Sequence, residues 1–190
     1  MLPDREQALI LLDEAYERNP GPWKDHSIVV AKCAYVISKQ CDDMDEEKAY
    51  IIGLLHDIGR REGVTSLAHV INGYHYLMGL GYDEAARICI THSFAIKDID
   101  TCIINKDVSD IELKEICGLI DGYEYDDYDA LIQLCDSIAL PAGPTKIEVR
   151  MNDVKQRYGH YPSNKWNKHI EIKHYFENKS GLNIDCLETL

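Results

Sequence analysis

The sequence predicts an all-α protein, and three observations lead to this prediction. Apolar residues recur at helical spacing along most of the 190-residue chain. We find no stretch with the alternation of apolar and polar residues that a half-buried strand requires. Glycine, proline and acidic residues gather between the periodic segments, where helices end and begin. We therefore expect about eight or nine helices, without an internal repeat.

The first half of the chain predicts helices separated by short breaks. The first helix ends at Asn19-Pro20-Gly21-Pro22, since these residues do not continue a helix. The acidic residues of the segment 42–47 suit the positive end of the helix that follows. Ser66 is a suitable N-cap for the next one. The predicted helices are Asp4–Arg18, Trp23–Gln40, Glu46–Ile58, Ser66–Leu80 and Glu84–Thr91.

The second half predicts longer breaks. Phe94–Ser109 has weak periodicity, so we expect a loop there, and Asp121–Asp129 is a loop dense in acids and tyrosines. The predicted helices are Asp110–Ile120, Ala130–Leu140, which Pro141–Pro144 ends, Lys146–Tyr158 and Asn164–Glu177, with a short piece after Gly181. No linker separates these segments. We expect a single domain over residues 1–190, with a core motif region at 23–140 and C-terminal helices at 144–190.

Composition excludes some classes of partner. The net charge is −13, from 20 basic and 33 acidic residues. This charge argues against binding to a nucleic acid polymer or an anionic membrane, although a small anionic substrate stays compatible with it. There is no apolar stretch of membrane-spanning length and no signal-peptide pattern at the start. Seven scattered cysteines without a CxxC pair indicate reduced thiols, and we expect a cytoplasmic protein.

One apolar stretch contains a histidine and an aspartate side by side. In Ile51–Arg60, the pair His56-Asp57 follows a run of apolar residues. An ionised carboxylate in such surroundings is costly unless it is paired or bound to a metal ion. One explanation is an ordinary helix end at which Asp57 pairs with Arg60, three residues further on. The other is a metal site.

Further polar residues interrupt apolar helical stretches elsewhere in the chain. Each one alone fits a hydrogen-bonded core residue. Together, four imidazoles and two carboxylates converge only if a cation lies among them. Mixed nitrogen and oxygen ligands suit iron, manganese, zinc, nickel or cobalt better than magnesium or calcium. The predicted metal ligands are His26, His56, Asp57, His69, His92 and Asp136.

The order of these residues resembles a known family. His26, then His56-Asp57, then Asp136 is similar to the H…HD…D signature of the HD-domain metal-dependent phosphohydrolases, which are all-α proteins. The surroundings Gly53–Arg60 and Leu134–Asp136 are similar as well. The resemblance implies that His26, His56, Asp57 and Asp136 hold a metal ion. His69 and His92 lie where members of this family place either the ligands of a second ion or histidines that contact the phosphate, and Asp57 would bridge two ions if both are present.

Two closer resemblances add detail. The runs Gly59–Glu62, Thr91–Ser93 and Tyr125–Asp129 resemble a clostridial-type group of HD-domain proteins over nearly the whole chain, a match that implies no particular substrate. The single histidines at positions 69 and 92 make the arrangement similar to that of the branch that hydrolyses diadenosine tetraphosphate with iron. This similarity favours iron as the bound metal. Members with the richest histidine set have two adjacent histidines where this chain has His92-Ser93. Whether one or two ions bind therefore stays open.

The predicted function is that of a metal-dependent phosphohydrolase. It would hydrolyse a nucleotide or related phosphoester with a metal-activated water, and Asp57 and Arg60 are the expected catalytic residues. Arg60 and Lys97 are the expected substrate contacts, although Arg60 could instead form an ion pair. We expect Arg61 to pair with Glu62.

Alternative functions use the same pocket. One is a non-catalytic sensor of metal and nucleotide, and another is a di-iron oxygenase of the HD type. The expected partner is a small phosphorylated molecule, and a homodimer stays open. His75 lies six residues after His69, on another face of the helix, so we expect it to be structural or exposed.

Overall fold

The structure is a computed structural model that describes residues 1–189. The predicted all-α class is confirmed, because nine α-helices make up most of the described chain. The α-helices are α1 (Arg5–Arg18), α2 (Trp23–Ser38), α3 (Glu46–Leu55), α4 (Ala68–Gly79), α5 (Asp83–Thr91), α6 (Asp110–Gly122), α7 (Asp127–Asp136), α8 (Ile147–Tyr158) and α9 (Ser163–Ser180). The 3-10 turns are η1 (Ile58–Glu62), η2 (Ile99–Thr101) and η3 (Ile184–Thr189), and the strands are β1 (Ala139–Leu140) and β2 (Gly143–Pro144).

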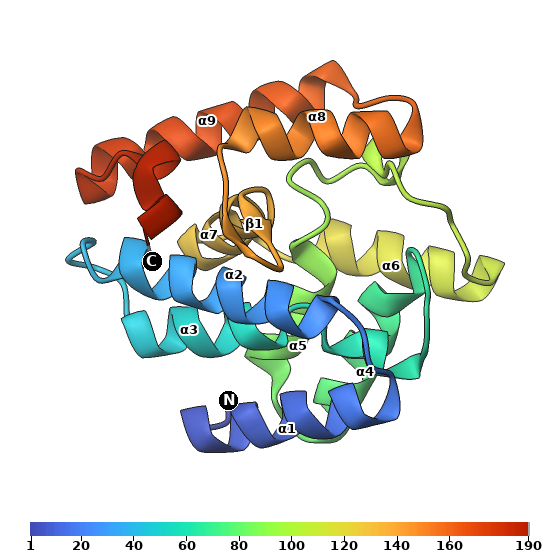
Figure 1. Cartoon of the computed structure of the whole chain (residues 1–190). Coiled ribbons are helices and arrows are strands. Elements are labelled where there is room, and N and C mark those ends of the chain that lie inside the picture. The colour runs from blue at the N-terminus through green and yellow to red at the C-terminus, as the bar shows by residue number, and fades with distance from the viewer. Residues whose placement is uncertain (190) are drawn as a thin grey trace.

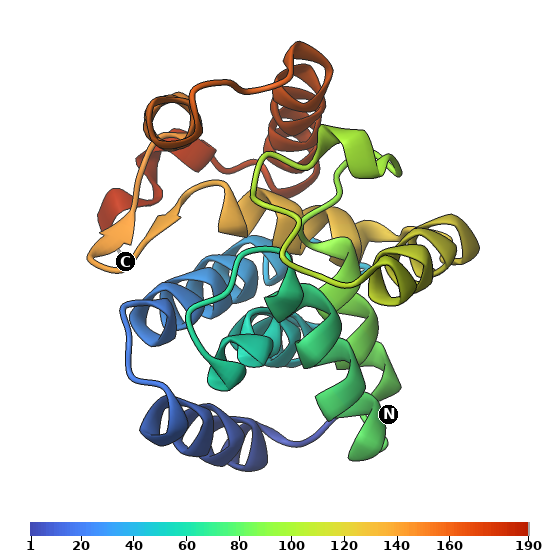
Figure 2. The ribbon, with the colours of Figure 1, turned by 90° about the vertical axis from the view of Figure 1, so that its right-hand side faces the viewer.

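The helices form layers around a central group. Helices α2 and α3 lie in the middle, α1 lies on one side, and α8 and α9 lie on the opposite side (Figure 1). The same arrangement is seen in the second view (Figure 2). One core cluster joins the layers, since Val30 of α2, Leu134 of α7, Met151 of α8 and Phe176 of α9 all belong to it. The C-terminal helices are thus packed onto the helices that carry the HD pair and its partners.

Side-chain caps set where several helices begin. The Asp4 carboxylate accepts from the backbone N–H of Gln7 at 2.8 Å at the start of α1. Ser109 and Glu112 form a capping box at α6, and Asp126 and Asp129 form one at α7. Such caps satisfy backbone N–H groups that a helix leaves unpaired. The end of the segment Asp121–Asp129, which is rich in acids and tyrosines, therefore starts the helix that carries Asp136.

Several helix boundaries differ from the sequence-based prediction, among them those of α7, which covers Asp127–Asp136 and not Ala130–Leu140. The third helix ends at Leu55, and the chain after the HD pair continues as the 3-10 turn η1. Ser66 is not the N-cap of α4. The carboxylate of Asp107 accepts instead from the N–H groups of Ser66, at 2.7 Å, and Ala68, at 2.9 Å. A distant side chain has taken the role that the local sequence suggested for Ser66.

A small hairpin replaces the simple break predicted at Pro141–Pro144. Its strands pair antiparallel, with Ala139 opposite Pro144 and Leu140 opposite Gly143. Two-residue strands are too short to show an alternating pattern in the sequence. None of the helices in the described part of the chain combines the length and the apolar character needed to cross a bilayer.

Two glycines allow η1 and α4 to touch backbone to backbone. A Cβ placed on Gly59 would lie 2.0 Å from the carbonyl oxygen of His69, and one on Gly73 would lie 2.9 Å from Sγ of Cys89. No side chain fits at Gly59 without moving the backbone. This close approach brings the turn after Asp57 against the helix that carries His69.

Candidate metal centre

The predicted ligands come from five helices whose ends meet at one place. His26 lies at the start of α2, and His69 lies in the first turn of α4. His56 and His92 are the C-caps of α3 and α5, and Asp136 is the last residue of α7. All are buried apart from Asp136, whose side chain is 33% exposed. The structure brings together every residue of the predicted ligand set.

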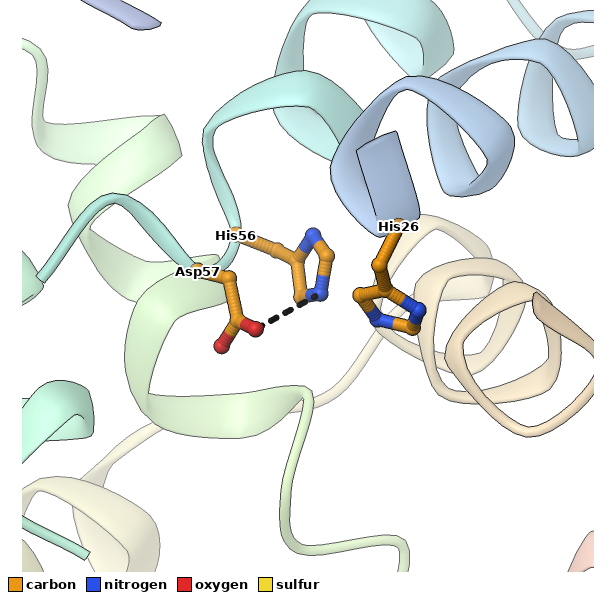
Figure 3. Close-up of side chains that lie close together, drawn as sticks. All are labelled: His26, His56 and Asp57. Atoms are coloured by element: carbon orange, nitrogen blue, oxygen red, sulfur yellow. Dashed lines mark ion pairs between the residues drawn. The ribbon is translucent and has the colours of Figure 1, made fainter. Parts of the chain in front are cut away.

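One group of ligand atoms lies between α2, α3 and α7. His26, His56 and Asp57 each offer an atom within 4.8 Å of the others, and Figure 3 shows their side chains facing one point. The Nε2 atom of His56 lies 3.9 Å from Oδ2 of Asp57, the pair joined by the dashed line, and 4.0 Å from Oδ1 of Asp136. Asp136 also contacts His26, with 3.0 Å between Oδ1 and Nε2.

A second group shares Asp57 with the first. Oδ1 of Asp57 lies 3.1 Å from Nε2 of His69 and 3.7 Å from Nε2 of His92. The two Nε2 atoms are 3.4 Å apart. These three residues again offer atoms within 4.8 Å of one another. Asp57 is therefore placed between two sets of nitrogen ligands.

Hydrogen bonds to backbone carbonyls fix how three of the imidazoles are protonated. Nδ1 of His56 bonds to the carbonyl oxygen of Gly53 at 2.7 Å, Nδ1 of His92 to that of Ile88 at 3.0 Å, and Nδ1 of His69 to that of Ser66. A carbonyl oxygen only accepts, so Nδ1 carries the proton and Nε2 of a neutral ring carries a lone pair. The three Nε2 lone pairs face the Asp57 carboxylate, which also only accepts.

This arrangement of acceptors fits a bound divalent metal ion. In the described residues, Nε2 of His56 and Oδ1 of Asp57 are buried and have no hydrogen-bond partner. Buried polar atoms without a partner are costly, and a cation among them removes that cost. Backbone acceptors behind ligating imidazoles are also the usual arrangement at metal sites. The Oγ atom of Ser93 lies 3.0 Å from Nε2 of His92, a contact that would compete with a metal ion for this nitrogen.

Charge states in the cluster suit metal binding too. Burial raises the pKa of Asp57 and of Asp136. The Arg60 guanidinium, together with nearby imidazoles, more than offsets this for Asp57, and the hydrogen bond with His26, together with nearby imidazoles, does so for Asp136. Both carboxyls therefore have a pKa below the ordinary range. Burial and the nearby His56 lower the pKa of His92 to about 3, and burial lowers that of His56. Ionised carboxylates and neutral imidazoles are the forms that ligate metals.

The comparison with known families agrees with this geometry. The family model described as HD domain matches residues 23–139, which is more than half of the chain. The chain belongs to the HD domain family. This places it in a superfamily of metal-dependent phosphohydrolases. No curated protein and no solved structure gives a match. The closer resemblance to a clostridial-type group therefore stays a prediction.

Arg60 forms the predicted ion pair and also lines a cavity. Its Nε donates to Oδ2 of Asp57 at 2.5 Å. Arg60 lies in the lining of the cavity above the candidate metal ligands. Nη1 lies 3.4 Å from the carbonyl oxygen of Thr65, and Nη2 has no hydrogen-bond partner in the described residues. The contact with Asp57 thus leaves N–H groups of the guanidinium without a partner, and the substrate contact stays a prediction.

Lys97 lies apart from the cavity. Its ammonium donates to the carbonyl oxygen of Tyr123 and lies 4.8 Å from the ring centre of Tyr125. The predicted substrate contact of Lys97 gains no support from this position. Arg61 pairs with Glu62, as predicted, with 3.4 Å between Nε and Oε1. His75 is exposed and pairs with Glu115, which confirms the expectation that it lies on another face of α4.

A cavity of about 700 Å³ opens above the HD-domain ligands. One side of it is formed by the HD-domain match, and the other is formed by α8, α9 and the segment between them. Sequence analysis missed this second side, whose lining includes Arg150, Asp153, Arg157, Tyr158, Tyr161, Lys165 and His169. The sequence predicts helices in these segments, but periodicity does not show which of their polar and aromatic side chains face a cavity.

Proposed function

We propose that this HD-domain protein hydrolyses a phosphate ester or anhydride bond of a nucleotide or a related small molecule, with a divalent metal ion. One observation carries the proposal: two groups of imidazole nitrogens share the Asp57 carboxylate at the base of a cavity of about 700 Å³. Cavities of this size take small organic ligands. The cytoplasmic location and the nucleotide as substrate class are parts of this proposal.

In the proposed site, His26, His56, Asp57 and Asp136 hold one ion. His69 and His92 hold a second, with Asp57 common to both groups. The nitrogen and oxygen donors suit iron, manganese, zinc, nickel or cobalt, and iron is our first choice. When bound, such an ion lowers the pKa of a water molecule and stabilises negative charge that develops on a phosphoryl oxygen.

The side chains of the protein position the reactants. Arg60 is held by its Nε contact with Asp57, so its remaining N–H groups are oriented to bind a phosphoryl oxygen. The backbone bonds of His56, His69 and His92 hold their rings in one orientation. Burial of these rings keeps bulk water away from them, which strengthens every charge interaction in the site.

Aromatic side chains support a nucleotide as the substrate class. Trp23, Tyr158 and Tyr161 line the same cavity as the ligands. The flat face of a base packs well on such rings.

Two measurements test the proposal. Purified protein is analysed for bound metal, and phosphate release is followed with a panel of nucleotides. We expect bound transition metal and turnover, and we expect Asp57→Ala to lose both, while His75→Ala, a change at an exposed histidine outside the site, keeps both. Absence of metal, or full activity in Asp57→Ala, would contradict the proposal. Tight nucleotide binding without turnover under any metal would favour the sensor instead.

A further inference from the structure

Lys165 is a buried lysine beside the metal centre. It lies in the first turn of α9 and is only 7% exposed. Its ammonium donates to the carbonyl oxygen of Ser93 at 3.0 Å, next to the ligand His92, and its side chain lines the large cavity. The HD domain match ends at residue 139, so Lys165 lies outside the matched residues.

The Lys165 ammonium lacks a negative partner. Among the described residues it forms no ion pair with a carboxylate, and the Ser93 carbonyl is its only hydrogen-bond acceptor. An ammonium group has three N–H donors, so two are left. A buried cation without a bonded counter-charge is costly, and burial lowers the pKa of Lys165 by more than the nearby Asp136 carboxylate raises it. An anion that enters the cavity would remove this cost.

Arg150 of α8 is a second cation on the same wall of the cavity, the side formed by α8, α9 and the segment between them, and it too has an N–H group without a hydrogen-bond partner. Its side chain is 19% exposed, and Nη1 lies 3.1 Å from Oδ2 of Asp153. Its Nε atom is buried without a hydrogen-bond partner in the described residues. On this wall, the described lining residues include three cations, Arg150, Arg157 and Lys165, and one carboxylate, that of Asp153. The wall is therefore positive in a chain whose net charge is −13.

We propose that Lys165 and Arg150 bind a second phosphate group of the substrate, remote from the phosphate that is hydrolysed. The metal centre and Arg60 would hold the first group, and the wall formed by α8 and α9 would hold the other. Preferred substrates thus carry at least two phosphate groups. This inference rests on the proposed function, because it names the substrate class of the same cavity.

A purely structural role for Lys165 makes a different prediction. The bond to Ser93 ties α9 to the segment that follows His92. If that tie were the only role, replacing Lys165 would slow the hydrolysis of every substrate alike. If the ammonium binds a second phosphate, the loss of kcat/KM is confined to substrates that carry two phosphate groups and appears mainly as a higher KM.

The kinetic test compares a nucleoside 5′-monophosphate with the 5′-diphosphate and the 3′,5′-bisphosphate of the same nucleoside. We expect Lys165→Met to lower kcat/KM for the two-phosphate substrates by about tenfold or more, the usual effect of losing a charged hydrogen bond. Arg150→Met should act in the same direction. Lys168→Met is the matched control, since Lys168 lies one turn further along α9, exposed and paired with Glu171, and it should change nothing. Equal losses on all three substrates would overturn the inference.

A binding measurement separates this inference from the proposed function. The affinity of the metal-loaded protein for inorganic pyrophosphate is measured by calorimetry, which needs no turnover. We expect Lys165→Met to weaken pyrophosphate binding by about tenfold, with Lys168→Met as wild type. If the wild type hydrolyses no nucleotide, the proposed function fails, yet weakened pyrophosphate binding would still support the anion site. Unchanged pyrophosphate affinity in Lys165→Met would overturn it.

The melting temperature of Lys165→Met shows whether the variant folds normally. Methionine has a similar length and no charge, so Lys165→Met removes a buried cation that lacks a counter-charge. We expect the melting temperature without ligand to stay equal or to rise. A clear fall would mean that the ammonium stabilises the fold by itself, which contradicts the argument for a missing anion.

Discussion

Nε2 of His26 lies 3.0 Å from Oδ1 of Asp136, although 110 residues separate them in the chain. The contact joins the start of α2 to the end of α7 and closes one side of the metal centre. It also explains why the pattern of the family spans so much of the sequence. The ligands lie at the ends of helices, and those ends meet only when the bundle has packed.

Asp136→Asn tests this side of the site. Asparagine keeps the shape but loses the charge, so a metal ion held with His26 should bind far more weakly. We expect a lower metal content and a fall in kcat of about 100-fold or more, at least the size seen when partners of metal ligands are changed. Elemental analysis and phosphate release measure both. Asp100→Asn, at a side chain that is 84% exposed, is the control and should behave as wild type.

Metal removal should reduce stability. An ion that binds only the folded chain, present at a hundred times its dissociation constant, stabilises it by about 2.7 kcal/mol. For a chain of this size, that corresponds to a fall in melting temperature of roughly 5–10 °C on chelation. Scanning calorimetry with and without chelator measures it. Asp136→Asn should show a smaller fall, and an equal fall in both proteins would argue against ligation by Asp136.

Gly59→Ala should destabilise the fold and the site together. The added Cβ would lie 2.0 Å from the carbonyl oxygen of His69, so η1 and α4 must separate. We expect a loss of about 3 kcal/mol, at the upper end for overpacking, with weaker metal binding because Asp57 and His69 move apart. Gly118→Ala in α6 is the matched control. It has open space around it, and it should stabilise by about 0.5–1 kcal/mol. Urea denaturation distinguishes the two.

Asp107→Ala should loosen the start of α4. The Asp107 carboxylate accepts from the N–H groups of Ser66 and Ala68, just before His69. Loss of such a cap costs about 1 kcal/mol. Because the Ser66 carbonyl orients His69, we also expect weaker metal binding. Titration of the apo protein with metal measures this, and an unchanged affinity would show that α4 starts correctly without Asp107.

The same carboxylate predicts a dependence on pH. Burial raises the pKa of Asp107, but hydrogen bonds from the N–H groups of Ser66 and Ala68 lower it further, so it lies below the ordinary value in the folded state. Its contribution is therefore complete above the unfolded pKa of about 3.9 and is lost as the pH falls through the folded value. The stability difference between wild type and Asp107→Ala should shrink as the pH falls below about 4. A constant difference would contradict this origin.

The sequence was sufficient to predict the helical class and to select the residues that the structure brings together at the metal centre. His56 and Asp57 stand out because they follow an apolar run, where polar residues need a partner. Asp136 stands out for the same reason in α7. The periodicity of the helices also fixed most boundaries to within a few residues, since each helix buries one face.

The other side of the cavity was not predictable in this way. Lys165 and Arg150 are ordinary cations of two predicted helices, and only the packing of α8 and α9 onto the bundle turns them toward the cavity. Ser66 and Lys97 show the opposite problem. The local sequence suggested Ser66 as a cap, but the distant Asp107 supplies that contact, and the substrate contact suggested for Lys97 gains no support from its position beside Tyr123. Such choices depend on which segments meet, and spacing along the chain does not contain that information.

The boundary of the HD domain match, at residue 139, falls between the two walls of the cavity. In the proposed assignment, the residues before this boundary carry out the hydrolysis, and those after it determine which substrate is preferred. Substitutions in α8 and α9 can therefore change the preferred substrate while the chemistry stays the same. Proteins that share the HD pattern but end in different helices would diverge in what they hydrolyse, and grafting those helices between relatives offers a way to exchange their specificity.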